Sequence, residues 1–318
     1  MRVDEHTINL DESPVFYRRA ADTPGVPTLY LHGIPTSSDD WVEFLARTGG
    51  VAPDLIGFGR SGKGGHLDYS LDGITRFVEW FLAEMQLDTV KLVAHDWGAA
   101  VGLTLAGRHP ERIERLVLLN APPILGRGFS WPRLVRIWRT PLIGEGLMGA
   151  TTRGMLARAL RRGSVREDAW PDTRVAEVWD QFDQGTQRAI LRLVRSAGPA
   201  GGPGRTGGTR GPGGGAGGPS RTGGPGGGGP SRTGGPGGGG GGPSRTGGPG
   251  AGAGELPSTD APALIVWGER DPWYPPGLAH AYAAHLPGAR VERVPDAGHW
   301  PWLERSDLIE HVATFLEE

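Results

Sequence analysis

The residues best suited to chemistry lie in His95-Asp96-Trp97-Gly98-Ala99, where an apolar strand meets a helix within one residue. Small residues flank this junction, as a sharp turn that exposes a reactive central side chain requires. The central residue is Asp96. A helix N-terminus stabilises a carboxylate, so Asp96 is expected to stay ionised at pH 7 and to attack an electrophilic carbon without a base. An Asp before a helix is also a common N-cap, so this motif alone leaves the role of Asp96 open.

Two later segments place an acid and a histidine after strands. Asp271 follows the apolar run at 263–267, and His299 follows the run at 290–294. In an open parallel sheet, sites form beyond the carboxyl ends of the strands, and Asp96, Asp271 and His299 all occupy such positions. Their order of nucleophile, acid and histidine matches a triad in which the acid orients the histidine and the histidine activates water. The three positions together predict a catalytic triad.

A glycine turn after an early strand supplies the expected oxyanion hole. The turn is His32-Gly33-Ile34-Pro35. The backbone N–H groups of Ile34 and Trp97 are expected to converge on Asp96 and to stabilise developing negative charge. His32 is interpreted as a buried structural histidine beneath this turn rather than as a catalytic one.

The elements that position these residues follow from hydrophobic periodicity. Short apolar runs alternate with helical patterns, which predicts an α/β fold with a mostly parallel sheet of about eight strands and helices on both faces. The predicted strands are 15–19, 28–32, 51–55, 90–94, 113–119, 263–267 and 290–294. The predicted helices are 70–87, 97–108, 131–139, 154–162, 175–196, 276–286 and 302–316. Residues 121–196 contain no convincing strand, so we interpret them as a helical cap inserted between two strands of the sheet.

A stretch of very different composition follows the cap. Residues 197–254 hold 31 of the 56 Gly and nine of the 28 Pro, with no acidic, aromatic or large aliphatic residue. Such a segment buries too little apolar surface to offset its ordering entropy, so we expect a disordered insert whose deletion leaves the fold nearly unchanged. The predicted domains are therefore a core at 1–120 and 255–318, a cap at 121–196 and the insert at 197–254.

Composition and charge exclude several classes of protein. The absence of cysteine excludes disulfide scaffolds and thiolate chemistry. Without the five Arg of the insert, the formal net charge changes from −2 to −7, which gives no reason to expect nucleic-acid binding. No apolar run approaches the roughly 20 residues that span a bilayer, and acids replace the basic and apolar start of a signal peptide. We therefore expect a cytoplasmic protein with no membrane partner and no metal or organic cofactor; its oligomeric state is left open.

Three motifs resemble a known family. They are HGIPTSS at 32–38, DLIGFGRS at 54–61 and HDWG at 95–98. They resemble the α/β-hydrolase superfamily, and most closely its haloalkane dehalogenase and epoxide hydrolase branches, over 10–120 and 256–316. In both branches, an elbow aspartate forms a covalent alkyl ester that histidine-activated water hydrolyses. The resemblance implies Asp96 as the nucleophile, His299 as the base and Asp271 as the acid.

Residues that bind a leaving group favour the dehalogenase branch. Trp97 matches a halide-binding tryptophan of that branch, and its indole N–H is a suitable donor. The second donor there is an Asn directly after His-Gly or a cap tryptophan, whereas Ile34 has no side-chain donor. The candidate replacements in the cap are Trp131, Trp138, Trp170 and Trp179. Asn120 stands where other dehalogenases keep their acid, and it cannot act there in ionised form.

Epoxide hydrolases use cap tyrosines to protonate the epoxide oxygen, and residues 121–197 contain no Tyr. Val194 occupies the segment where that branch places one, and Tyr274, beside Asp271, lies outside the cap and is interpreted as a poor replacement. We therefore predict a haloalkane dehalogenase-like hydrolase acting on a small apolar substrate and water, ahead of an epoxide hydrolase. A small-molecule-binding protein with little turnover and a plain esterase are further alternatives, against which the complete triad and Asp96 in place of Ser weigh.

Overall fold

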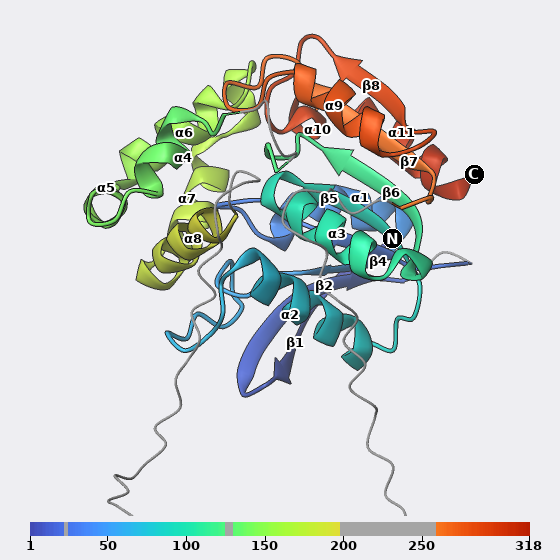
Figure 1. The fold of residues 1–318 in the computed structure, drawn as a ribbon, viewed down its shortest axis with the longest axis horizontal. Coiled ribbons are helices and arrows are strands. Elements are labelled where there is room, and N and C mark those ends of the chain that lie inside the picture. The colour runs from blue at the N-terminus through green and yellow to red at the C-terminus, as the bar shows by residue number, and fades with distance from the viewer. Residues whose placement is uncertain (22–24, 125–129, 198–258) are drawn as a thin grey trace, which may run out of the picture. The chain divides into compact units, whose positions relative to one another are not determined.

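A sheet of eight strands organises the chain in a computed structural model that describes residues 1–21, 25–124, 130–197 and 259–318 (Figure 1). The strand order is β1-β2-β4-β3-β5-β6-β7-β8. The pairs β1–β2 and β2–β4 are antiparallel, and the other pairs are parallel. The strands are β1 (Val3–Leu10), β2 (Ser13–Ala20), β3 (Thr28–Leu31), β4 (Gly50–Pro53), β5 (Val90–His95), β6 (Ile113–Leu119), β7 (Ala263–Gly268) and β8 (Arg290–Val294). The predicted mostly parallel sheet of about eight strands is confirmed.

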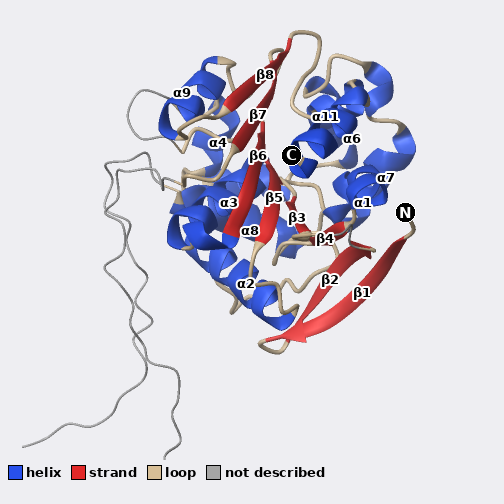
Figure 2. Cartoon of the chain, turned by 90° about the vertical axis from the view of Figure 1, so that its right-hand side faces the viewer, coloured by secondary structure: helices blue, strands red, loops and turns tan. Residues whose placement is uncertain are grey.

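Helices cover both faces of the sheet. Figure 2 shows the sheet edge-on, with α2, α3 and α9 on one side and α1 and α11 on the other. The bounds are α1 (Val42–Thr48), α2 (Leu71–Glu84), α3 (Asp96–Arg108), α9 (Gly277–His285), α10 (Pro301–Glu304) and α11 (Asp307–Glu317). The sequence explains α2 directly, because the Ser70 side chain accepts the Gly73 N–H at its start and Ile74, Phe77 and Phe81 are buried at helical spacing. The apolar faces of sheet and helices thus form the core.

In the described part of the chain, five α-helices lie between β6 and β7 and form the block that we call the cap (Figure 1). They are α4 (Arg133–Trp138), α5 (Ile143–Gly149), α6 (Arg153–Arg162), α7 (Asp172–Gln181) and α8 (Gln184–Ser196). All described residues belong to one compact unit. The exact domain boundaries stay a prediction, and the predicted insert at 197–254 lies outside the described residues except for Ala197.

Two predicted helices are each divided in the structure. The prediction at 175–196 is wrong in running through Phe182, whose backbone ends α7; the Asp183 side chain then accepts the Thr186 N–H and begins α8. The prediction at 302–316 is likewise wrong in being continuous, since α10 ends before Arg305 and α11 begins at Asp307. Among the helices that the structure describes, none is long and apolar enough to cross a membrane.

Candidate active site

Asp96 lies at a sharp junction between β5 and α3. Strand β5 runs directly into the helix, and Asp96 is the first helical residue, with φ of +47° and 1% exposure. A non-glycine residue with positive φ is strained and tends to mark a functional site. A Cβ at Gly98 would collide with the backbone oxygens of Leu31 and His32, so glycine is required where α3 crosses the end of β3.

The turn after β3 lies directly against the Asp96 carboxylate. The Ile34 N–H donates to Asp96 Oδ2 over 2.9 Å, and the Trp97 N–H also bonds to this carboxylate. The predicted pair of backbone donors therefore meets at one carboxyl group. A Cβ at Gly33 would overlap the Asp96 side chain, so this turn too needs glycine.

Asp271 and His299 complete the cluster from the ends of β7 and β8. His299 Nδ1 lies 2.7 Å from Asp271 Oδ2, and His299 Nε2 lies 4.0 Å from Asp96 Oδ1. All three side chains are buried, at 8% exposure or less. The longer distance exceeds a hydrogen bond, so the second imidazole nitrogen remains available to a water molecule beside Asp96.

The Asp271 carboxylate is fixed by several donors besides His299. Its Oδ2 accepts a hydrogen bond from Asn120 Nδ2 over 2.7 Å, and its Oδ1 accepts the N–H groups of Trp273 and Tyr274. The Asp271 oxygens accept all of these hydrogen bonds. In the contact with Asp271 Oδ2, His299 Nδ1 is therefore the donor. Asn120, which follows β6, therefore holds the acid in place rather than replacing it.

Burial sets the electrostatics of the cluster. Burial raises the pKa of Asp96, opposed by the nearby His299 and by the hydrogen bonds from Tyr274, Ile34 and Trp97. The expectation based on the helix N-terminus alone therefore omitted the larger effect. Burial by itself lowers the pKa of His299, but the charge and hydrogen bond of Asp271 outweigh it, and the net shift is upward.

His32 has the structural role that the sequence indicated. It is fully buried, its Nδ1 lies 2.8 Å from Gly33 O, and its Nε2 lies 2.9 Å from the Leu55 nitrogen. A backbone N–H can only donate, so Nε2 accepts and Nδ1 donates, which defines a neutral ring. Burial also lowers the pKa of His32. The ring thus ties the turn after β3 to the segment after β4.

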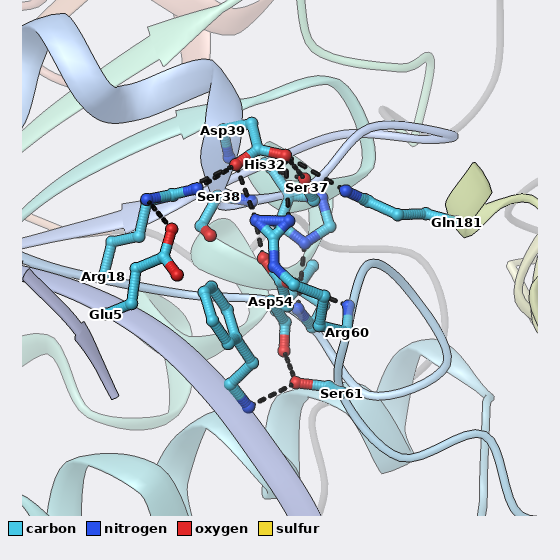
Figure 3. Close-up of polar contacts among 12 residues, drawn as sticks. Glu5, Arg18, His32, Ser37, Ser38, Asp39, Asp54, Arg60, Ser61 and Gln181 are labelled. Carbon is cyan, nitrogen blue, oxygen red and sulfur yellow. Dashed lines mark hydrogen bonds and ion pairs between the residues drawn. The ribbon is translucent and has the colours of Figure 1, made fainter. Parts of the chain in front are cut away.

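The motif at 54–61 supports the same turn (Figure 3). Asp54 Oδ1 accepts the Ser38 N–H, Asp54 Oδ2 accepts the Arg60 N–H, and the Ser61 hydroxyl donates to the Asp54 carbonyl. Asp39 lies among the side chains of Arg18, Arg60 and Gln181 in the same view. Since Gln181 ends α7, this polar cluster joins the core to the cap.

A cavity of about 170 Å³ opens beside Asp96 and His299. The core contributes Asp96, His299 and neighbouring side chains, while the cap contributes mostly apolar ones. The cap residues that line it are Pro132, Leu134, Val135, Trp138, Leu147, Met148, Thr151, Met155, Leu156, Ala159, Leu160, Phe182 and Ile190. This lining suits a small apolar molecule placed against Asp96.

The tryptophans considered as donors divide into those that line the cavity and those that pack away from it. Trp97 lines the cavity, is 1% exposed, and its Nε1 has no hydrogen-bond partner in the described chain. Of the four cap tryptophans considered as second donors, Trp138 lines the cavity, whereas Trp131 stacks on the Trp97 ring with centroids 5.5 Å apart. Trp170 packs against Trp300, and Trp179 stacks on Phe182.

Tyr274, which the sequence interpretation set aside as a poor replacement for a cap tyrosine, lies against Asp96. Its hydroxyl donates to Asp96 Oδ1 over 2.7 Å, and the side chain lines the cavity. The signal in the sequence was its place three residues after Asp271. The Asp271 carboxylate accepts the Tyr274 N–H and so turns this loop toward the cavity.

Within the described ranges, no group of three or more His, Cys, Asp or Glu residues has the arrangement of a metal site.

Comparison with known proteins identifies relatives over part of the chain. A haloalkane dehalogenase of Mesorhizobium japonicum is 34% identical over 149 residues, which cover 44% of this chain and 47% of the relative. One of Mycobacterium marinum is 37% identical over 174 residues, covering 48% and 53%. The chain thus spans about half the length of the curated relatives it matches.

Solved structures extend the likeness of the fold to nearly the whole chain. Haloalkane dehalogenase DbeA from Bradyrhizobium elkani superposes with a TM-score of 0.71 at 19% identity, covering 99% of this chain and 98% of that one. The epoxide hydrolase CorEH gives 0.71 at 17% identity, covering 99% of each. The family model described as alpha/beta hydrolase fold matches residues 27–144 and 164–306. The chain therefore belongs to the alpha/beta hydrolase fold family.

Proposed function

We propose that the chain is a haloalkane dehalogenase-like hydrolase that acts on small apolar substrates through a covalent ester on Asp96. The carrying observation is the placement of the Asp96 carboxylate: the Ile34 N–H binds one oxygen, and the other lies 4.0 Å from His299 at the wall of an apolar cavity. The partial similarity to haloalkane dehalogenases supports this choice of branch.

The first step forms the ester. Asp96 Oδ1 attacks the carbon that bears the halogen, and the electron pair of the carbon–halogen bond leaves with the halide. The Trp97 indole N–H donates to the departing ion, since it is buried beside Asp96 and no described residue accepts its hydrogen bond. The apolar cap lining excludes bulk water, which strengthens these interactions.

The second step cleaves the ester. His299 Nε2 takes a proton from water, whose oxygen attacks the Asp96 carboxyl carbon, while the N–H groups of Ile34 and Trp97 stabilise the oxyanion. Asp271 stabilises the imidazolium and fixes its orientation through Nδ1. The alcohol leaves with the proton from His299, and the carboxylic acid that remains at Asp96 gives its proton to solvent, so that haloalkane and water yield alcohol, halide and one released proton.

The experiment that tests this mechanism is trapping of the ester. His299→Gln keeps the nucleophile but removes the base, so incubation with a short bromoalkane should add one alkyl group to the intact mass. Peptide mapping should place that mass on Asp96. An unmodified mass, with a substrate that the wild-type protein converts, contradicts the proposal.

A paired product assay separates the alternatives. Short bromoalkanes and small epoxides are incubated with the wild-type protein, and halide and diol are measured in parallel. Halide release supports the dehalogenase-like activity, and diol formation without halide release supports an epoxide hydrolase. Binding of either ligand without product supports a small-molecule-binding protein.

A further inference from the structure

A phenol hydroxyl lies on the reactive side of the Asp96 carboxylate. Tyr274 Oη donates to Asp96 Oδ1 over 2.7 Å, and Tyr274 is 4% exposed at the cavity wall. The other oxygen, Oδ2, is occupied by the Ile34 N–H. Asp96 Oδ1 is also the oxygen nearer to His299 in the ion-pair geometry, so it is the attacking oxygen of the proposed mechanism. Tyr274 therefore touches the atom that forms the new bond.

Ester formation changes what this hydroxyl binds best. In the resting site it donates to a charged carboxylate, and charge-assisted hydrogen bonds are roughly twice as strong as neutral ones. When Oδ1 becomes an ester oxygen, it loses that charge, and the negative charge passes to the departing atom. The strongest acceptor within reach of Tyr274 is then the leaving group.

Of the two residues whose backbone N–H groups face Asp96, only Trp97 also has a side-chain donor. Trp97 Nε1 offers one N–H, whereas Ile34 presents only a hydrocarbon side chain to the cavity. Tyr274 keeps its proton throughout the neutral pH range, because burial and the neighbouring Asp96 charge raise its pKa well above the ordinary value. A protonated hydroxyl beside Asp96 is thus available to donate.

We propose that Tyr274 is a catalytic residue whose hydroxyl transfers its hydrogen bond from Asp96 to the leaving group, forming a two-donor site with Trp97. The proposal rests on the proposed Asp96 ester mechanism. With a haloalkane, the halide leaves with the bonding electron pair and accepts hydrogen bonds from both donors, and no proton moves.

The same hydroxyl fits a more basic leaving group. With an epoxide, the electron pair of the broken carbon–oxygen bond goes to the oxygen, which takes the Tyr274 proton. Hydrolysis of the ester then leaves Asp96 as a carboxylic acid, and its proton returns to the phenolate across the 2.7 Å contact. Atoms balance as epoxide plus water to diol. The need for Tyr274 therefore increases with the basicity of the leaving atom.

The test measures ester formation with Tyr274→Phe in the His299→Gln background. Rates are followed by intact mass for matched iodo-, bromo- and chloroalkanes. The substitution should slow ester formation by about threefold for iodide and by roughly 30-fold or more for chloride. A residue that merely orients Asp96 would slow all three by one factor, and that result overturns the proposal.

A matched control and a binding measurement distinguish a failure of the Tyr274 proposal from a failure of the Asp96 mechanism. Tyr282→Phe removes another buried tyrosine hydroxyl, which donates to the Pro122 carbonyl, and should leave the three rates unchanged. If His299→Gln forms no ester with any substrate, the Asp96 mechanism fails. Calorimetric titration with bromide in the Asp96→Asn background, which lacks the carboxylate charge that holds the Tyr274 hydroxyl, then still decides on Tyr274: adding Tyr274→Phe should weaken bromide binding about tenfold. Equal affinity overturns the leaving-group role.

Discussion

The core and the cap contribute to the same cavity in different ways. The core supplies the polar groups from the ends of β3, β5, β7 and β8, where each side chain is fixed by short hydrogen bonds. The cap supplies apolar side chains from α4, α5, α6 and α8 that have no such partners. Under the proposed function, this difference assigns the reaction to the core, and the size and shape of the substrate to the cap.

The largest expected effect comes from Asp96, the proposed nucleophile. Asp96→Asn keeps the shape and tolerates the positive φ at this position, but an amide does not attack an alkyl carbon. Turnover of a haloalkane should fall about 10⁴-fold or more, measured by halide release, while the circular dichroism spectrum stays that of the wild type. Substantial residual turnover would show that another core group attacks the substrate.

The next largest effect is expected at Asp271, the proposed acid that orients His299. Asp271→Asn should lower ester hydrolysis by about 10²- to 10⁴-fold. The charge of Asp271 raises the pKa of His299, and His299 must be neutral to accept a proton, so hydrolysis by the wild type rises with pH through that raised pKa. Removing the charge lowers the pKa, and the rising limb of the pH–rate profile should move to lower pH. An unmoved limb would show that His299 is not the titrating base.

The contrast between the regions also explains what the sequence predicted. Asp96 and Asp271 follow the apolar runs that form the buried strands β5 and β7, and His299 follows the more polar strand β8, which pairs with β7 in parallel. Their meeting at one sheet edge therefore follows from parallel topology. The contact of Tyr274 with Asp96 could not be predicted, because its direction depends on a loop folded around the Asp271 carboxylate, which no periodicity encodes.

The cap was predicted as helical, but not in detail. Helix α5 escaped detection because Gly144, Gly146 and Gly149 interrupt its apolar pattern. Strand β1, at one edge of the sheet, was also missed. Its apolar and polar residues do not alternate strictly, as expected for an exposed edge strand. Cavity-lining residues depend on how helices pack, so single-helix patterns did not identify them.

A pair of leucines tests whether the cap sets substrate fit. Leu156 lines the cavity from α6, and Leu308 is buried in α11 away from it. Either Leu→Ala change should reduce the free energy of unfolding by about 2–5 kcal/mol, measured by urea denaturation. Leu156→Ala alone should also raise KM for a short haloalkane by about three- to tenfold with little change in kcat. Equal KM values for the two variants would contradict the proposal that the cap determines how the substrate fits.

The smallest expected change in stability concerns the polar contact between Gln181 of the cap and Asp39 of the core. Gln181 Nε2 donates to Asp39 Oδ2 over 3.1 Å, but Asp39 also accepts from Arg18 and Arg60 of the core. Gln181→Ala leaves that carboxylate paired, so the loss of unfolding free energy should be about 0.5–1.5 kcal/mol. Gln184→Ala, at an exposed position of α8, serves as the control and should stay within about 0.5 kcal/mol of the wild type.

The pH dependence shows whether the Gln181 contact acts through the charge of Asp39. Burial raises the pKa of Asp39, but Arg60, Arg18 and Gln181 outweigh it, so the net shift is downward. A carboxyl group with a depressed folded-state pKa stabilises the fold above its unfolded pKa, and this contribution is lost as pH falls through the folded value. The difference between Gln181→Ala and the wild type should therefore shrink in acid. A difference that stays constant with pH would mean that packing, rather than the hydrogen bond to a charged Asp39, joins α7 to the core.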